Sequence, residues 1–196
     1  MEIKIAKTKI EKEAIFLFRY EIYINELGKF FLNKNKADNK FSDELDDDAY
    51  IIYSEDQSGN IIGCVRFLIQ CQDERLTRKY KLQKDFQDNK LIQIDRFMID
   101  KKHRGSSLSL RFMLWMYKFA LKCNVHTCLI EVEPHLVKLY QKLGFVEYDE
   151  SYVNNDKSRR RILCFLELRD KNALEKVGSP LLAILNTHDQ RSTVES

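Results

Sequence analysis

Residues 104–109 combine an arginine, a glycine and three serines directly before the most apolar segment of the chain. A strand that enters a helix through a short loop leaves the first backbone N–H groups of the helix unpaired, with the positive end of the helix dipole behind them. Such a site binds phosphate, and the forked cation of Arg104 and the small Gly105 would assist it. The alternative is that Ser106 or Ser107 only caps the helix.

Hydrophobic periodicity predicts the elements that must position this loop. Apolar residues at helical spacing indicate a first helix over residues 9–28, ending at Gly28. Next, we expect a polar loop or lid at 33–48, the two strands of a hairpin at 49–53 and 61–70, and a charged, partly helical excursion at 73–90. The second half of the chain is expected to contain strands at 91–100, 126–132, 145–153 and 160–168, a buried helix at 106–123 and a helix at 134–144. This order describes one α+β or mixed α/β domain over residues 1–170. Residues 171–196 are expected to form a C-terminal extension, with a short helix and then a disordered tail.

Composition excludes several classes of protein. The 196 residues include 33 basic and 30 acidic ones, and this net charge of +3 is too balanced for a dedicated nucleic-acid binder. The five cysteines show neither a paired spacing nor a Cys/His pattern, so we expect no disulfide framework and no metal site. The N-terminus lacks the apolar core of a signal peptide, and the longest apolar run, 112–117, is too short to span a bilayer. We therefore expect a cytoplasmic protein without a transmembrane segment.

The segment FMIDKKHRGSSLSL, residues 97–110, resembles the acyl-CoA-binding segment of the GNAT acyltransferase superfamily. The resemblance implies a GNAT-like single domain whose central, mostly antiparallel, twisted sheet is splayed at the donor site and flanked by helices. The family usually has glycines where this chain has Ser107 and Ser109, and serine keeps the N–H donor but has less conformational freedom. The resemblance implies that the thioester donor is bound by Phe97, Met98, Ile99, Arg104, Gly105, Ser106, Ser107, Leu108 and Ser109.

The segment VEPHLVKLYQKLGF, residues 132–145, resembles a second signature of the GNAT superfamily. Tyr140, Gly144 and Phe145 match its pattern. The resemblance implies that Tyr140 protonates the departing thiolate during acyl transfer. The alternative is an interior tyrosine whose hydroxyl is satisfied by the protein.

Three further segments resemble acyl-homoserine lactone synthases: residues 19–29, 45–68 and 93–100. The closing pattern, EPHLVKLYQKLGFVEYDE, is more similar to long-chain N-acyl amino acid synthases. The resemblance implies that a set of charged residues binds the acceptor substrate: Arg19, Asp46, Asp48, Arg66 and Arg96. The alternative is that these residues form a structural ion-pair network, because half-buried arginines need acidic partners.

The residue expected to deprotonate the acceptor amine departs from the lactone synthase pattern. Those enzymes have a glutamate where this chain has Gln93, and an amide cannot accept a proton at neutral pH. Asp95 lies on the same strand face by alternation and could take over this role. Glu131, at the end of the neighbouring strand, is a further candidate.

Together these resemblances imply an N-acyltransferase that moves a medium or long acyl chain from acyl-CoA or acyl carrier protein to the amine of an amino-acid-like acceptor. The basic residues Lys101, Lys102 and Arg111 could receive an acidic carrier protein or simply be solvated. Large apolar residues near residues 112–116 could line an acyl tunnel or fill the core. The alternative functions are a short-chain acetyltransferase using acetyl-CoA, and a non-catalytic protein of GNAT fold that binds an acyl ligand or a partner.

Overall fold

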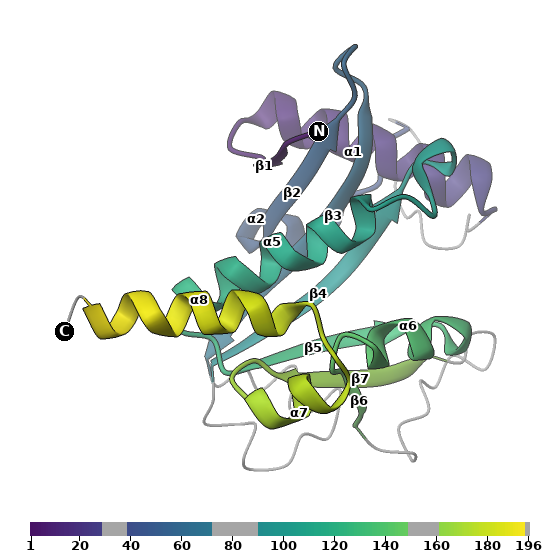
Figure 1. Ribbon diagram of the computed structural model, residues 1–196. Helices are drawn as coiled ribbons and strands as arrows, with labels where there is room; N and C mark the ends of the chain where they lie inside the picture. Colours follow the sequence, from purple (N-terminus) through teal and green to yellow (C-terminus); the bar gives the residue numbers. More distant parts are fainter. Residues whose placement is uncertain (29–38, 72–89, 149–160, 195–196) are drawn as a thin grey trace. The chain divides into compact units, whose positions relative to one another are not determined.

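The computed structural model describes residues 1–28, 39–71, 90–148 and 161–194 (Figure 1). The chain divides into two compact units. Unit 1 contains residues 1–68 and 95–112, and unit 2 contains residues 69–94 and 113–196. Strand β4 and helix α5 both pass from one unit into the other along the chain.

The described residues contain seven strands in one sheet, in the order β1-β2-β3-β4-β5-β7-β6. Neighbouring strands β4 and β5 are parallel, from Leu91 opposite Thr127 to Ile94 opposite Ile130. The pairs β1–β2, β2–β3, β5–β7 and β6–β7 are antiparallel, so the sheet is mixed and mostly antiparallel, as predicted. The strands are β1 Ile3–Ile5, β2 Tyr50–Glu55, β3 Ile61–Cys71, β4 Lys90–Ile99, β5 Thr127–Val132, β6 Val146–Glu147 and β7 Ile162–Glu167.

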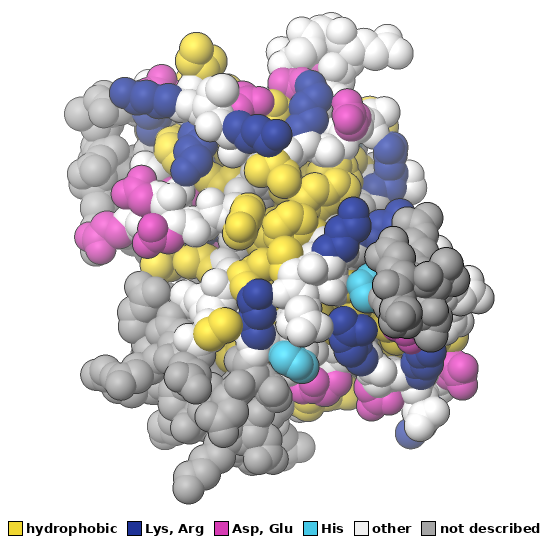
Figure 2. Space-filling model, turned by 90° about the vertical axis from the view of Figure 1, so that its left-hand side faces the viewer, with side chains coloured by type: hydrophobic (Ala, Val, Ile, Leu, Met, Phe, Trp, Pro, Cys, Tyr) yellow, Lys and Arg dark blue, Asp and Glu magenta, His cyan; other side chains and the backbone are white. Residues whose placement is uncertain are grey.

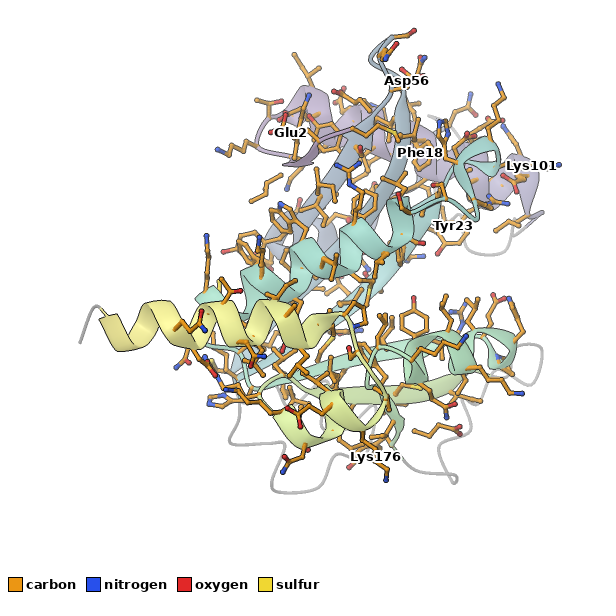
Figure 3. All side chains as sticks on the ribbon, viewed as in Figure 1. Glu2, Phe18, Tyr23, Asp56, Lys101 and Lys176 are labelled. Atoms are coloured by element: carbon orange, nitrogen blue, oxygen red, sulfur yellow. The ribbon has the colours of Figure 1, made fainter. Side chains whose placement is uncertain are left out.

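In unit 1 the predicted first helix is present but has two parts, α1 (Lys9–Tyr20) and the π-helix η1 (Glu21–Glu26). A capping box starts α1, because the side chain of Thr8 accepts the N–H of Glu11 and the Glu11 carboxylate accepts the N–H of Thr8. Gly28 follows η1 with a φ of 62°, as the predicted stop requires. The short helices α2 (Leu45–Asp48) and η3 (Lys101–His103) complete the unit, and Asp56 lies in the β2–β3 turn (Figure 3).

Gly63, on β3, has no room for a side chain. A Cβ there would lie 2.9 Å from Cε2 of Phe112 and 3.3 Å from the carbonyl oxygen of Met98. We expect Gly63→Ala to lower the free energy of unfolding by about 1–3 kcal/mol, the usual effect of overpacking a core, measured by urea denaturation. In a Phe112→Leu background the additional loss should be smaller, because the ring contact is gone. Equal losses in both backgrounds would contradict this explanation.

The described residues of unit 2 contain strands β5, β6 and β7 and parts of β4 and of helix α5 (Leu108–Lys122). They also contain the helices η4 (Pro134–Leu136), α6 (Val137–Gln141), α7 (Lys171–Lys176) and α8 (Leu181–Val194). Gly144, with a φ of 105°, follows α6 as predicted. The unit contains an apolar cavity of about 20 Å³, large enough for roughly one water molecule. It is lined by Ile92, Ile94, Met113, Met116, Tyr117, Ala120, Cys128, Phe145, Leu166, Leu168 and Leu181.

The C-terminal tail differs from the expectation. The sequence predicted a short helix and then disorder, whereas α8 continues to Val194. Leu181 and Leu185, one helical turn apart, are buried, and the carboxylate of Asp189 pairs with Lys171 at 2.7 Å. These tertiary contacts hold a segment whose polar composition suggested no structure. The division at residue 171 stays a prediction.

Some expectations lie outside the described residues: the first part of the loop at 33–48 (residues 33–38), nearly all of the excursion at 73–90, and the end of the strand at 145–153. The described end of that loop differs from the expectation, because residues 45–48 form the short helix α2. None of the described helices has the length and apolarity that crossing a membrane requires. All five cysteines are free thiols, and Cys64, Cys128 and Cys164 are buried.

Candidate active site

Arg66 is the centre of an ion-pair cluster in unit 1. Its side chain, on β3, is only 2% exposed, and its Nε and Nη2 donate to the two carboxylate oxygens of Asp95 at 2.7 Å each. Its Nη1 donates to Asp43 and lies 3.3 Å from Oδ1 of Asp46. Burial acts to lower the pKa of Arg66, but the hydrogen bonds and charge of Asp95 outweigh it and raise that pKa. The cation is therefore permanently charged and held from three sides.

Arg19 extends the cluster into the first helix. The side chain is fully buried, and its Nη1 donates to Oδ1 of Asp46 at 2.7 Å. The second oxygen of Asp46 accepts the backbone N–H of Asp43 at 2.9 Å. Among the described residues, Nε and Nη2 of Arg19 have no hydrogen-bond partner. Buried unpaired donors are costly, so the ion pair with Asp46 compensates only part of the cost of burying Arg19.

Arg96 is held by aromatic rings and by Asp43. Its guanidinium carbon lies 4.6 Å from the ring centroid of Phe41 and 5.6 Å from that of Tyr23, which lies on η1 (Figure 3). Its Nη2 donates to Oδ2 of Asp43 at 2.7 Å. The backbone of Arg96 has a φ of 51°, a conformation that residues other than glycine seldom adopt within a strand. This strain is retained because the surrounding contacts fix the residue.

Asp43 bridges Arg66 and Arg96, and the sequence analysis did not identify it. The signal was present, because Asp43 lies three residues before Asp46 in the same acidic run. Burial would raise the pKa of Asp43, but hydrogen bonds from the two arginines lower it from 3.8 to about 2. Asp48, which the sequence placed in this set, is exposed at the end of α2 and forms none of the described ion pairs of the cluster.

The lowered pKa of Asp43 predicts acid sensitivity. Because its pKa is depressed in the folded state, its contribution to stability is present above about pH 4 and is lost as the pH falls toward 2. We expect Asp43→Asn to be less stable at pH 6 and to lose less stability than the wild type between pH 4 and 2, measured as the melting temperature against pH.

The control for this prediction is Asp47→Asn, an exposed change on α2. Hydrogen bonds from Thr8 and Lys7 also lower the pKa of Glu11 to about 2, so Glu11 contributes to the acid sensitivity of every variant. The effect of Asp43 is therefore the difference between the wild-type and Asp43→Asn curves of melting temperature against pH. Parallel curves for the wild type and Asp43→Asn would contradict the assignment.

The loop at residues 104–109 caps α5, which is one of the two interpretations made from the sequence, and its binding of phosphate stays a prediction. Ser106 caps α5, since its hydroxyl accepts the N–H of Leu108 at 3.2 Å and donates to the carbonyl of His103 at 2.6 Å. The N–H groups of Ser107 and Ser109 have no partner among the described residues, as an anion site requires. Gly105 has a φ of 76° and open space beside its Cα.

Arg104 is engaged by a partner that the sequence did not predict. Its Nε donates to the carbonyl of Ile99 at 2.9 Å, and its two terminal nitrogens pair with both carboxylate oxygens of Glu26, Nη2 to Oε2 at 2.9 Å. Three other residues that the resemblance assigned to binding the thioester donor are placed as follows. Met98 and Leu108 are buried, and the ring of Phe97 contacts Phe112 edge-on. The side chains of Met98 and Leu108 therefore support the loop, and only their backbones could meet a donor.

Tyr140, on α6 in unit 2, is 7% exposed and packs edge-on against Phe145 at 5.6 Å between ring centroids. Burial, with the neighbouring Cys128 and Cys164, raises the pKa of Tyr140 well above its usual 10. None of the hydrogen bonds between described residues involves its hydroxyl. A protonated, unengaged hydroxyl is what a general acid needs.

The candidate base residues lie on β4 and β5. Gln93 is 9% exposed and lies opposite Leu129, so Glu131, two residues farther along β5, is on the same sheet face. Both carboxylate oxygens of Asp95 accept hydrogen bonds from Arg66. In the described part of the chain, no three His, Cys, Asp or Glu side chains gather in a way that could hold a metal ion.

Solved structures identify the class of the fold. The acyl-homoserine lactone synthase LasI superposes with a TM-score of 0.68 at 15% identity, over 88% of this chain and 93% of that one. The CoA-dependent acyl-homoserine lactone synthase BjaI, with SAM and isopentyl-CoA, gives 0.65 at 16% identity over 89% and 90%. FeeM, an N-acyl amino acid synthase from uncultured soil microbes, gives 0.59 at 14% identity over 93% and 98%. The chain therefore has a GNAT-like α+β fold.

Within that class, the sequence identifies the family. The model of the N-acyl amino acid synthase FeeM family matches residues 14–167, and the chain belongs to this family. It is accordingly an N-acyltransferase, which confirms the acyl transfer implied by the GNAT resemblance. No curated protein matches the chain.

Proposed function

We propose that the enzyme transfers a medium or long acyl chain from an acyl-CoA or acyl carrier protein thioester to the amine of an amino-acid-like acceptor. The observation that supports this most strongly is the cluster of Arg19, Arg66 and Arg96 with three aspartates in unit 1. An amino acid carries an ammonium and a carboxylate, and a site with both charge signs can bind both. Figure 2 shows Lys and Arg among Asp and Glu on one face, a mixture that favours a small acceptor over nucleic acid.

In the proposed reaction the amine nitrogen attacks the thioester carbonyl carbon, the C–S bond breaks, and the thiolate takes the proton of the Tyr140 hydroxyl. The unpaired N–H groups of Ser107 and Ser109 at the start of α5 support binding of the donor phosphate. An acyl chain would enter the apolar cavity of unit 2 only if the flexible side chains of Met113 and Met116 in its wall moved, because its volume of about 20 Å³ holds roughly one water molecule.

The amine must lose a proton before or during the attack. Gln93 cannot take it, and Asp95 is already bound through both oxygens to Arg66. We assign the proton to Glu131, which is partly exposed on the sheet face of Gln93. In this proposal Asp95 positions Arg66, and Gln93 contributes hydrogen bonding alone.

A substrate panel tests the proposed function. Acetyl, octanoyl and palmitoyl groups are presented on CoA and on acyl carrier protein, each with the free amino acids, and thiol release is followed together with the mass of the product. We expect an N-acyl amino acid from the longer donors. Preference for acetyl-CoA would favour the short-chain alternative, and no turnover with any pair would overturn the proposed substrates.

The same panel tests the carrier protein as a partner. Lys101 and Lys102 are exposed on η3, directly before the donor loop (Figure 3). If they receive an acidic carrier protein, Lys101→Glu combined with Lys102→Glu should raise KM for carrier-bound donors. Added salt should then raise KM for the wild type and narrow the difference between the two proteins, because it screens the attraction in one and the repulsion in the other. An equal KM for the variant and the wild type would remove these lysines from the proposal.

A further inference from the structure

We propose that Glu26 competes with the phosphate of the acyl donor for Arg104, and so disfavours donors that carry a pyrophosphate. The inference rests on the proposed function, in which the loop at residues 104–109 binds the donor. Its starting point is that both terminal nitrogens of Arg104 pair with the two carboxylate oxygens of Glu26. A guanidinium binds carboxylate and phosphate through the same forked geometry, so one anion must leave when the other arrives.

The two partners are presented by fixed backbone. Glu26 is the last residue of η1, and that end is held by hydrogen bonds from Leu27 N–H to the Ile22 carbonyl and from Gly28 N–H to the Ile24 carbonyl, at 3.0 and 3.1 Å. Arg104 is held through Nε on the Ile99 carbonyl. π-Helical turns are frequent at functional sites because they redirect side chains locally. The arginine fork is therefore formed before any donor binds, but it is occupied.

Access and charge make exchange feasible. The side chain of Arg104 is 41% exposed and that of Glu26 is 26% exposed, so both can be reached from solvent. An exposed ion pair is weak, and a phosphate can displace it. With Glu26 in place, however, the positive charge of Arg104 is neutralised exactly where a pyrophosphate would need it. A single phosphodiester, as in the arm of a carrier protein, loses less from this competition because it has less charge to be compensated.

Binding to the free enzyme measures the competition without turnover. CoA and the methyl ester of 4′-phosphopantetheine, which carries a single phosphodiester, are titrated calorimetrically into the wild type, Glu26→Gln and the control Glu21→Gln. Glu21 is an exposed glutamate of the same π-helix, bound by Asn25 at 2.6 Å. We expect Glu26→Gln to bind CoA about two- to fivefold more tightly, the range for loss of one exposed ion pair, with a smaller gain for the methyl ester of 4′-phosphopantetheine. The control should bind both ligands like the wild type.

Weaker or unchanged binding of CoA by Glu26→Gln would overturn the inference, because Glu26 would then only orient Arg104 or be irrelevant to the donor. The variant Arg104→Met separates this failure from failure of the donor site itself. It should bind CoA less tightly than the wild type, and adding Glu26→Gln to it should give no further gain. If Arg104→Met binds CoA as well as the wild type, the donor assignment fails whatever Glu26 does.

Discussion

Replacing Tyr140 with phenylalanine is expected to lower kcat about 100- to 1,000-fold, the usual contribution of a positioned general acid. The buried ring and its contact with Phe145 remain, so KM for the donor and the melting temperature should change little. Because the pKa of Tyr140 is raised well above 10, its hydroxyl stays protonated up to that pH, and its role as an acid should cause no fall in activity below pH 10. Thiol release with a long-chain thioester measures the effect.

The leaving group gives the decisive control for Tyr140. A thioester of an acidic aromatic thiol needs no proton when it departs, so the variant should recover most of the wild-type rate with it. Tyr148→Phe is the matched change elsewhere in unit 2, where the ring also packs edge-on, against Phe165, and it should keep kcat within about twofold. A Tyr140→Phe variant that is equally slow with both leaving groups would show that the hydroxyl does not act as the acid.

Removing Arg66 is expected to have the largest effect on stability. Arg66→Met leaves Asp43, Asp46 and Asp95 without their shared cation, and breaking a buried pair in this way costs about 3–5 kcal/mol of unfolding free energy. Urea denaturation near pH 7 measures it. Adding Asp95→Asn to Arg66→Met should recover part of the loss, because one unpaired charge is removed.

An exposed ion pair provides the comparison for Arg66. Lys4 and Glu55 lie 2.6 Å apart with side chains 42% and 27% exposed, and Lys4→Met should lower the free energy of unfolding far less than Arg66→Met. If Arg66→Met were as mild as Lys4→Met, the cluster would not act as a buried ion-pair network.

Local sequence patterns predicted most of the elements and part of the site. Periodicity located β2, β3, β4, α5, β5 and β7, and the glycines at 28 and 144 were placed correctly as helix ends. These features depend on neighbours in sequence, where side-chain spacing is informative. The alternation of β4 also brought Asp95 into consideration before its pairing with Arg66 was known.

Glu26 and Asp43 were missed because their partners are distant in sequence. Glu26 meets Arg104 across 78 residues, and Asp43 meets Arg96 across 53. The π-helix was missed for a different reason: the apolar spacing of residues 21–26 fits an α-helix equally well. The length of α8 depends on tertiary contacts such as that of Asp189 with Lys171, which composition does not reveal.

The passage of one strand through both units bears on how the chain folds as it is synthesised. Unit 1 takes its first part from residues 1–68 and its second from residues 95–112. Arg66 is therefore synthesised before its partner Asp95, and the two residues cannot pair until β4 has left the ribosome. Domains usually fold as units during synthesis, but here the N-terminal unit can close its charged centre only after part of the next unit has emerged.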